Sequence, residues 1–144
     1  MSMRSNALLP VLALSTVLTA HTTDARADIM TTCTSEISQY CADVSEGEGR
    51  ISACLVGQMG QLSPACLADV QAEEQNPLTP DSVRKVFNPA FRAPLPEACA
   101  APAAQFCPDM TPGEGRVFAC LYARSDRVPK ACSDAAQAML EQAK

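Results

Sequence analysis

The chain has 144 residues and a formal net charge of −5, and it contains eight cysteines, one histidine and no tryptophan. An acidic chain without a basic cluster is a poor nucleic-acid binder, because phosphate contacts need Lys and Arg. The single histidine, His21, lies in a segment that we expect to be removed. The remaining chain would then lack the commonest general base and the commonest transition-metal ligand.

Residues 1–27 have the pattern of a signal peptide. Arg4 provides a basic start, residues 7–20 are an apolar run, and Ala25-Arg26-Ala27 is a small-x-small cleavage site. The alternative is a retained N-terminal anchor, for which the run is short. Cleavage removes Arg4, Arg26 and Asp24, which leaves 9 basic and 15 acidic side chains and a net charge of −6. We expect a secreted or periplasmic protein without a transmembrane segment in its mature chain.

The eight cysteines form two sets with identical spacing. They are Cys33, Cys41, Cys54 and Cys66, and then Cys99, Cys107, Cys120 and Cys132. Successive cysteines are 8, 13 and 12 positions apart in both sets, and 13 of 34 positions are identical between residues 33–66 and 99–132. The chain therefore holds two copies of one unit. We place a first repeat at residues 28–75, a Pro-rich linker with a short helix at 76–95, and a second repeat at 96–144.

An even number of cysteines in a small exported chain predicts disulfides, because units of this size rarely bury enough apolar surface to fold unaided. If Cys33 and Cys41 share a helix, they lie roughly 12 Å apart, beyond the reach of about 7 Å that a disulfide allows. An antiparallel hairpin favours a nested scheme. Its bonds are Cys33–Cys66 and Cys41–Cys54, repeated as Cys99–Cys132 and Cys107–Cys120. Reduced thiols that bind metal are the alternative.

The two repeats share an eleven-residue stretch, SEGEGRISACL at 45–55 and TPGEGRVFACL at 111–121. Ser45 with Glu48, and Thr111 with Glu114, match the capping box at a helix N-terminus. The apolar residues that follow have helical spacing, and little in the chain alternates with period two. We therefore predict an all-α fold of two tandem helical-hairpin modules stapled by disulfides.

Other helix boundaries follow from proline and small polar residues. Ser63 and Pro64 predict the start of a third helix, whose counterpart runs from about Pro129 to the C-terminus. Pro102 is expected to delay or kink the helix that follows Cys99. In the linker, Thr79 and Pro80 predict a short helix with one apolar face, formed by Val83, Val86 and Phe87.

The combination of C-x7-C, GEGR-x-x-x-CL and a fourth cysteine after LSPA resembles the cysteine-rich repeat of the Golgi glycoprotein, also called cysteine-rich fibroblast growth factor receptor or E-selectin ligand. Small exported bacterial proteins with a few repeats also resemble this family. The resemblance implies a binding or structural module, and growth-factor or selectin binding is not carried over. The second repeat departs from LSPA, because Val128-Pro129-Lys130 stands there, and Asp126 becomes the candidate cap of its third helix.

Arg50 and Arg116 recur at the same place in both repeats, at the start of a helix. They could bind an anion at the helix N-terminus. The interpretation we favour is an internal one: an ion pair with Asp43 or Asp109, or hydrogen bonds to carbonyl groups that end the previous helix. Glu48 and Glu114 are expected to be caps and not acid–base catalysts.

The sequence predicts no catalytic residue, no metal site and no cofactor. There is no C-x-x-C pair of the kind that thiol oxidoreductases use, and Met59, Met110 and Met139, which could suit copper(I), do not cluster in the sequence. We therefore predict an exported, non-enzymatic repeat protein with a structural or protein-binding role. The alternative is a thiol- or metal-handling envelope protein for copper or zinc. The sequence identifies neither the protein partner nor the oligomeric state.

Overall fold

A computed structural model describes residues 28–77, 79–81, 84–85, 93–110, 113 and 115–142. This part of the chain is helical and contains no strand, which confirms the predicted all-α fold. The first repeat contains α1 (Ile29–Thr32), α2 (Thr34–Tyr40), α3 (Arg50–Gly57), η1 (Met59–Gln61) and α4 (Pro64–Glu73). The second contains η2 (Glu97–Cys99), α6 (Ala100–Phe106), α7 (Arg116–Ala123) and α8 (Lys130–Gln142).

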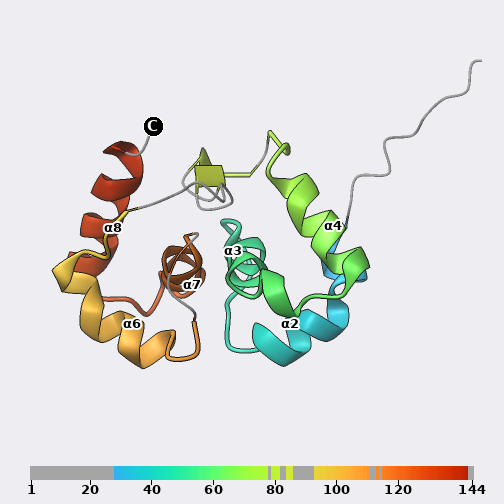
Figure 1. Ribbon diagram of the computed structural model, residues 1–144, viewed down its shortest axis with the longest axis horizontal. Helices are drawn as coiled ribbons and strands as arrows, with labels where there is room; N and C mark the ends of the chain where they lie inside the picture. Colours follow the sequence, from blue (N-terminus) through green and yellow to red (C-terminus); the bar gives the residue numbers. More distant parts are fainter. Residues whose placement is uncertain are drawn as a thin grey trace, which may run out of the picture.

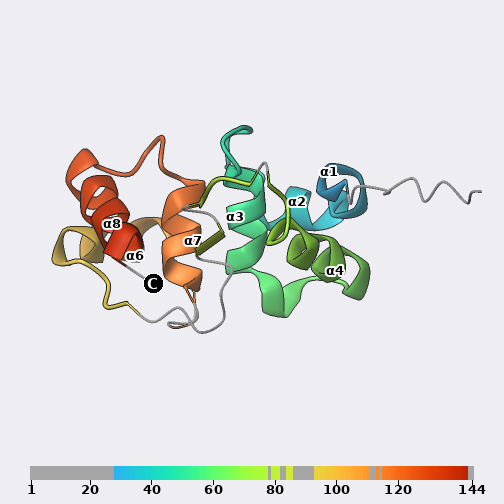
Figure 2. The same cartoon turned by 90° about the horizontal axis from the view of Figure 1, so that it is seen from above.

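The two repeats are arranged around the pair α3 and α7. These helices are seen end-on at the centre of Figure 1, and Figure 2 shows them side by side. Helices α2 and α4 lie on one outer side of the pair, and α6 and α8 occupy the matching positions on the other. The repeats are therefore related by an approximate two-fold axis that passes between the two equivalent helices.

Four disulfides staple the helices, each within one repeat. Cys33 pairs with Cys66 and Cys41 with Cys54, at Cα–Cα distances of 4.9 and 6.1 Å. The second repeat has the same two pairs, Cys99–Cys132 at 4.7 Å and Cys107–Cys120 at 6.1 Å. This is the nested pairing that the spacing favours. Six of the eight cysteines are at most 2 % exposed, so the sulfur atoms make up much of each small core.

Small residues let α3 and α7 approach closely. Gly57 closes α3, and a Cβ atom built on it would lie 3.3 Å from the Sδ of Met110 and 3.6 Å from the carbonyl oxygen of Arg116, at the start of α7. The end of α3 thus meets the start of α7, so the two helices run antiparallel. Ala53 and its equivalent Ala119 are both fully buried. The sequence pattern behind the contact is a small residue at every fourth position, which permits close helix packing.

The observed starts of α4, α6 and α8 can be compared with the starts that the sequence predicts. Ser63 is the N-cap of α4, as expected, and its hydroxyl accepts from the Cys66 amide at 3.4 Å. The helix after Cys99 begins at Ala100, which puts Pro102 in its first turn, where the missing N–H costs no intrahelical bond. Asp126 is not the cap of α8, because that helix begins four residues later and the Asp126 carboxylate accepts a hydrogen bond from Ser45.

The linker is tied to the end of the first repeat. The buried Thr79 hydroxyl donates to Glu73 at 2.9 Å, and the Arg84 amide donates to the Pro80 carbonyl at 2.9 Å, which is one turn of helical hydrogen bonding. The three apolar residues expected on its helical face, Val83, Val86 and Phe87, lie outside the described residues. In the part of the chain that the structure describes, no helix is long and apolar enough to cross a membrane.

Candidate functional site

The GEGR stretch forms a loop that closes around an arginine. Gly47, Glu48 and Gly49 have φ values of 96°, 52° and 72°, in the left-handed region that favours glycine. The Arg50 guanidinium donates to the carbonyl oxygens of Ser45 (3.0 Å) and Glu46 (2.6 Å), and to the Glu48 carboxylate at 2.8 Å. The motif therefore needs glycine for the turn and arginine to satisfy the carbonyl groups inside it.

The predicted cap at this loop is wrong, and of the two internal roles expected for Arg50 the structure contains hydrogen bonds to carbonyl groups and not the ion pair with Asp43. Helix α3 begins at Arg50 with Gly49 as its N-cap, and no side chain caps it, so the capping box of Ser45 and Glu48 does not form. Arg50 does not pair with Asp43, because its donors go to the loop carbonyls and to Glu48. These three acceptors favour an internal role for the guanidinium over anion binding.

The described residues of the equivalent stretch in the second repeat, Gly113, Gly115 and Arg116, repeat the geometry of the first. Gly113 and Gly115 have φ values of 110° and 71°, and Gly115 is the N-cap of α7. A Cβ atom on Gly113 would lie 3.9 Å from Arg116 Nη2, against 3.7 Å between the equivalent Gly47 and Arg50. The predicted caps Thr111 and Glu114 lie outside the described residues, and Gly115 takes the N-cap position that was assigned to Thr111.

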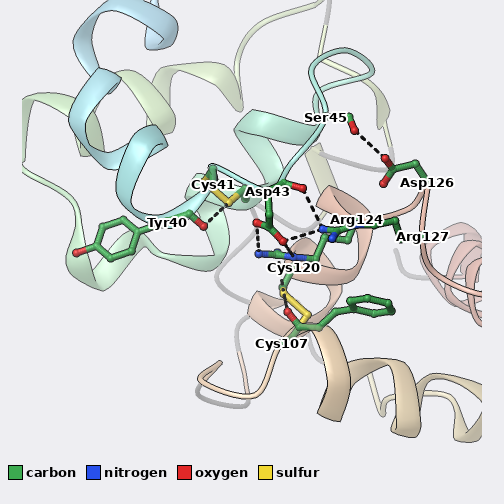
Figure 3. A network of polar contacts seen from close by, with 11 residues as sticks. Tyr40, Cys41, Asp43, Ser45, Cys107, Cys120, Arg124, Asp126 and Arg127 are labelled. Carbon is green, nitrogen blue, oxygen red and sulfur yellow. Dashed lines mark hydrogen bonds and ion pairs between the residues drawn. A yellow bond between two sulfur atoms is a disulfide. The ribbon is translucent and has the colours of Figure 1, made fainter.

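Asp43 holds the two repeats together. Arg124 donates Nε and Nη2 to its two carboxylate oxygens at 3.1 and 3.0 Å. Arg127 donates Nη2 to one of these oxygens at 2.7 Å and to the Asp43 carbonyl at 3.0 Å. The Arg127 guanidinium also lies 5.5 Å from the centre of the Phe106 ring. We call this group of Asp43, Arg124 and Arg127 the clasp (Figure 3).

Two further hydrogen bonds extend the contact beside the clasp. The Ser45 hydroxyl donates to the Asp126 carboxylate at 2.7 Å, and the Tyr122 hydroxyl donates to the Glu48 carbonyl at 2.9 Å. Partial burial alone would raise the pKa of Asp43, but the hydrogen bonds from Arg127 and Arg124 outweigh it and hold the pKa below its ordinary value. The bond from Ser45 likewise lowers the pKa of Asp126.

The clasp forms at one end of the two-fold arrangement. By the alignment of the repeats, Asp109 is the counterpart of Asp43, but Gln58 and Gln61 stand where the second repeat has Arg124 and Arg127. Asp109 is exposed, and the ion pairs between described residues do not include it. The ion pair that we expected between Arg116 and Asp109 is therefore not among the ion pairs of the described residues. A difference between two otherwise similar repeats is the sequence signal that could have located the clasp.

Glu36 is a buried carboxylate that the sequence analysis missed. It is 7 % exposed and accepts from the Ser63 amide at 3.1 Å and from the Ser35 hydroxyl at 2.7 Å. Hydrogen bonds from Ser63, and then from Ser35, lower its pKa from 4.5 to about 2. Glu36 thereby fastens α2 to the start of α4. Its spacing of three from Cys33 on the buried face of α2 was the available signal.

A groove of about 1130 Å³ opens between α7, α8 and the linker. Its lining includes the apolar residues Phe118, Leu121, Tyr122, Val128 and Ala136. The charged residues of the described lining are Glu48, Glu74, Asp81, Arg84 and Lys85. We call this site the α7–α8 groove. Sequence reasoning did not find it, because its lining comes from both repeats and from the linker.

All eight cysteines are bonded in disulfides, so none offers a thiol to an electrophile or a metal ion. The part of the chain that is described contains no group of three or more His, Cys, Asp or Glu side chains placed to hold a metal ion. The described lining of the groove offers apolar contact, hydrogen-bonding groups and charge.

The scan against protein-family models found a match to residues 16–63, described as a cysteine rich repeat. The match covers 48 of the 144 residues, so the first repeat is similar to the cysteine rich repeat that this family model describes. The matched residues include three cysteines of the first repeat and the GEGR loop, and they end three positions before Cys66. The cysteine-rich repeat family is not an enzyme family. Searches of the curated proteins and of the solved structures found no match.

Proposed function

We propose that this cysteine-rich repeat protein is an exported, non-enzymatic module that binds a partner protein in the α7–α8 groove. The observation that carries the proposal is the groove itself, whose lining combines apolar and charged side chains. Concave, largely apolar surfaces with a few polar groups are the usual form of binding sites. The volume of about 1130 Å³ lies just above the range of roughly 300–1,000 Å³ typical of small-molecule pockets, which leaves room for a segment of a protein chain.

The disulfides that hold the helices around the groove favour binding by a preorganised surface. Helix α7 carries Cys120, which is bonded to Cys107 before the GEGR loop, and α8 carries Cys132, which is bonded to Cys99. Two covalent links therefore hold the helices that line the groove. A surface fixed in this way loses little conformational entropy on binding, which favours affinity.

Export is part of the same proposal, with residues 1–27 as a removed signal peptide. Four disulfides in a small protein are typical of an oxidising compartment. Helix α1 begins directly after Asp28, whose side chain accepts from the Met30 amide at 3.1 Å, so cleavage before Asp28 would leave all described helices intact. We also propose the division into repeats at 28–75 and 96–144, joined by the linker at 76–95.

Capture of partners from an envelope extract tests the groove. Gln137 lines it and is exposed on α8, so Gln137→Trp would fill it, whereas Ala138→Trp adds the same ring to the adjacent exposed position outside the described lining. We expect the parent and Ala138→Trp to retain the same protein, and Gln137→Trp to lose it. Equal capture by both variants would contradict binding in the groove. Equal capture by an all-Ser cysteine variant would contradict binding by a folded module.

Two measurements test the export and the oxidised state. Mass spectrometry of the protein from a cell envelope or culture medium should find a mature N-terminus at Asp28. A thiol assay on denatured, unreduced protein should find no reactive thiol. A retained N-terminus would contradict cleavage, and four or more thiols with bound copper or zinc would favour a metal-handling protein.

A further inference from the structure

We propose that two copies of this chain exchange repeats to form a dimer, in which α3 of each chain packs against α7 of the other. The covalent structure permits this exchange. Each of the four disulfides joins two cysteines of the same repeat, so the linker at residues 76–95 is the sole covalent connection between the repeats. The repeats can separate while both stay stapled.

The contacts between the two repeats themselves can form between two chains as well as within one. It consists of α3 against α7, the clasp, and the bonds Ser45–Asp126 and Tyr122–Glu48. Every one of these contacts joins a residue before the linker to a residue after it. An exchanged dimer therefore contains the same two contacts as two separate monomers, which is the condition for domain swapping.

Side-chain sizes select the first repeat as the partner of the second. At one end of the helix pair Gly57 faces the long Met110 side chain, with 3.3 Å between its built Cβ and Sδ. At the equivalent end, Ala123 and the smaller Val44 lie in the same apolar cluster. Pairing two first repeats would place Gly57 opposite Val44 and leave a gap.

The charged residues of the clasp also disfavour the pairing of two first repeats. The clasp needs Asp43 opposite Arg124 and Arg127, and the first repeat has Gln58 and Gln61 at the equivalent positions. Two first repeats would therefore form no clasp.

Side-chain size disfavours the pairing of two second repeats. These could form the clasp through Asp109, but Met110 would then face Ala123. The Ala123 Cβ would be crowded at the 3.3 Å found for the equivalent Gly57. The expected dimer is therefore reciprocal, with each first repeat bound to the second repeat of the other chain.

The linker sets the concentration at which exchange occurs. Because monomer and dimer contain the same contacts, their balance depends on the effective concentration that the linker imposes on its two repeats. Short flexible linkers give effective concentrations on the order of millimolar. At micromolar concentrations the chain should be monomeric, and exchange needs the contact to be opened at high concentration.

The test opens the contact without reducing the disulfides. Protein at about 1 mM is held in urea without a thiol, the urea is removed, and the mass is measured by light scattering after gel filtration. We expect a dimer whose share falls when the urea step is done at about a hundredth of that concentration. An equal mixture of normal and isotope-labelled chains should give mixed dimers in native mass spectrometry. Monomers alone at both concentrations would overturn the proposal.

Reversion of the dimer identifies the surface that is exchanged. After dilution the trapped dimer returns to monomer, and each return must break α3–α7 contacts. Gly57→Val crowds this contact, whereas Gly60→Val adds the same atoms where nothing lies within 4 Å. We expect Gly57→Val to revert at least ten times faster than Gly60→Val. Equal rates would show a dimer formed through another surface and would overturn the proposal.

A second pair of variants tests the exchange even if Gly57→Val fails to fold. Asp43→Ala removes the clasp and leaves both helices unchanged, and Asp109→Ala removes the equivalent exposed carboxylate. The Asp43→Ala dimer should revert several-fold faster than the Asp109→Ala dimer. Identical reversion of these two dimers would also overturn the exchange, because the clasp would then lie outside the contact that breaks.

Discussion

Gly57 at the end of α3 faces the carbonyl oxygen of Arg116 at the start of α7, and a Cβ atom on Gly57 would lie 3.6 Å from that oxygen. The two halves of the molecule therefore meet nearly backbone to backbone at this point. A larger side chain at position 57 must displace the Met110 sulfur, which would lie 3.3 Å from its Cβ, and its further atoms would press on the α7 backbone. The size of the residue at position 57, the last of α3, therefore determines how closely the two repeats pack.

Gly57→Val should lower the free energy of unfolding by roughly 1–3 kcal/mol, because the added methyl groups press on Met110 and on the α7 backbone. Gly60→Val, three residues later, should change it by less than about 0.5 kcal/mol, since its surroundings are open. Urea titrations of the oxidised proteins measure both. A Gly57→Val midpoint equal to that of Gly60→Val would show that the repeats do not pack through α3 and α7.

Removing a disulfide should destabilise the protein according to the loop that it closes. Chain-entropy estimates give roughly 3 kcal/mol for the 13-residue loop of Cys41–Cys54 and roughly 3.5 kcal/mol for the 33-residue loop of Cys33–Cys66. We expect Ala replacements of either pair to lower the melting temperature, the outer pair more. If dithiothreitol left the melting curve of the parent unchanged, the disulfides would not be the main source of stability.

Glu36 should make the protein sensitive to acid. Its pKa is lowered from 4.5 to about 2 in the folded state by the bonds from Ser63 and Ser35. The contribution to stability is therefore complete above pH 4.5 and is lost as the pH falls toward 2. Glu36→Gln should flatten the dependence of the urea midpoint on pH between 5 and 2, whereas exposed Glu74→Gln should leave it unchanged. A parent midpoint that stays constant over this range would contradict the assignment.

Asp43→Ala should lower the free energy of unfolding by about 1 kcal/mol, because the Arg124 guanidinium, whose side chain is 12 % exposed, loses its charged acceptor. Asp43 itself is half exposed, so salt should screen the interaction. The difference between Asp43→Ala and parent should shrink between 0.05 and 1 M NaCl, as measured by urea unfolding at about these two salt concentrations. Asp109→Ala is the control, and an equal loss in both variants would exclude a special role for the clasp.

The spacing of residues along the sequence was sufficient to predict the disulfide pairing and the all-α fold. The distances between successive cysteines, together with the length of a helix per residue, favour the nested pairing that the structure contains. The cap of α4 was equally predictable, because Ser63 precedes Pro64 directly. In both cases the deciding residues are close in the sequence or recur at fixed intervals.

The GEGR loop was misread because two local rules compete there. Ser45 and Glu48 match a capping box, but Gly47 and Gly49 permit a left-handed turn, and the Arg50 guanidinium satisfies the carbonyl groups that this turn exposes. The turn was the better solution, and α3 begins five residues after Ser45. Single-sequence capping patterns say nothing about an arginine that binds backward into the loop.

The clasp and the groove depend on contacts that local patterns do not contain. Asp43 and Arg124 are 81 positions apart, and the partners exist in one repeat only. Glu36 is different, since its place on the buried face of α2 was visible in the spacing. The signal for the clasp lies in the positions at which the two repeats differ, Gln58 and Gln61 against Arg124 and Arg127.

The placement of the disulfides has a mechanical consequence. A pulling force applied to the two ends of the oxidised chain cannot lengthen residues 33–66 or 99–132 beyond their closed loops, because the outer bond of each repeat carries the load. Extension is then restricted to the tails and to the stretch between Cys66 and Cys99. Under tension the two disulfide-closed repeats should keep their length while the segment between them extends. A reducing agent should then allow residues 33–66 and 99–132 to extend as well.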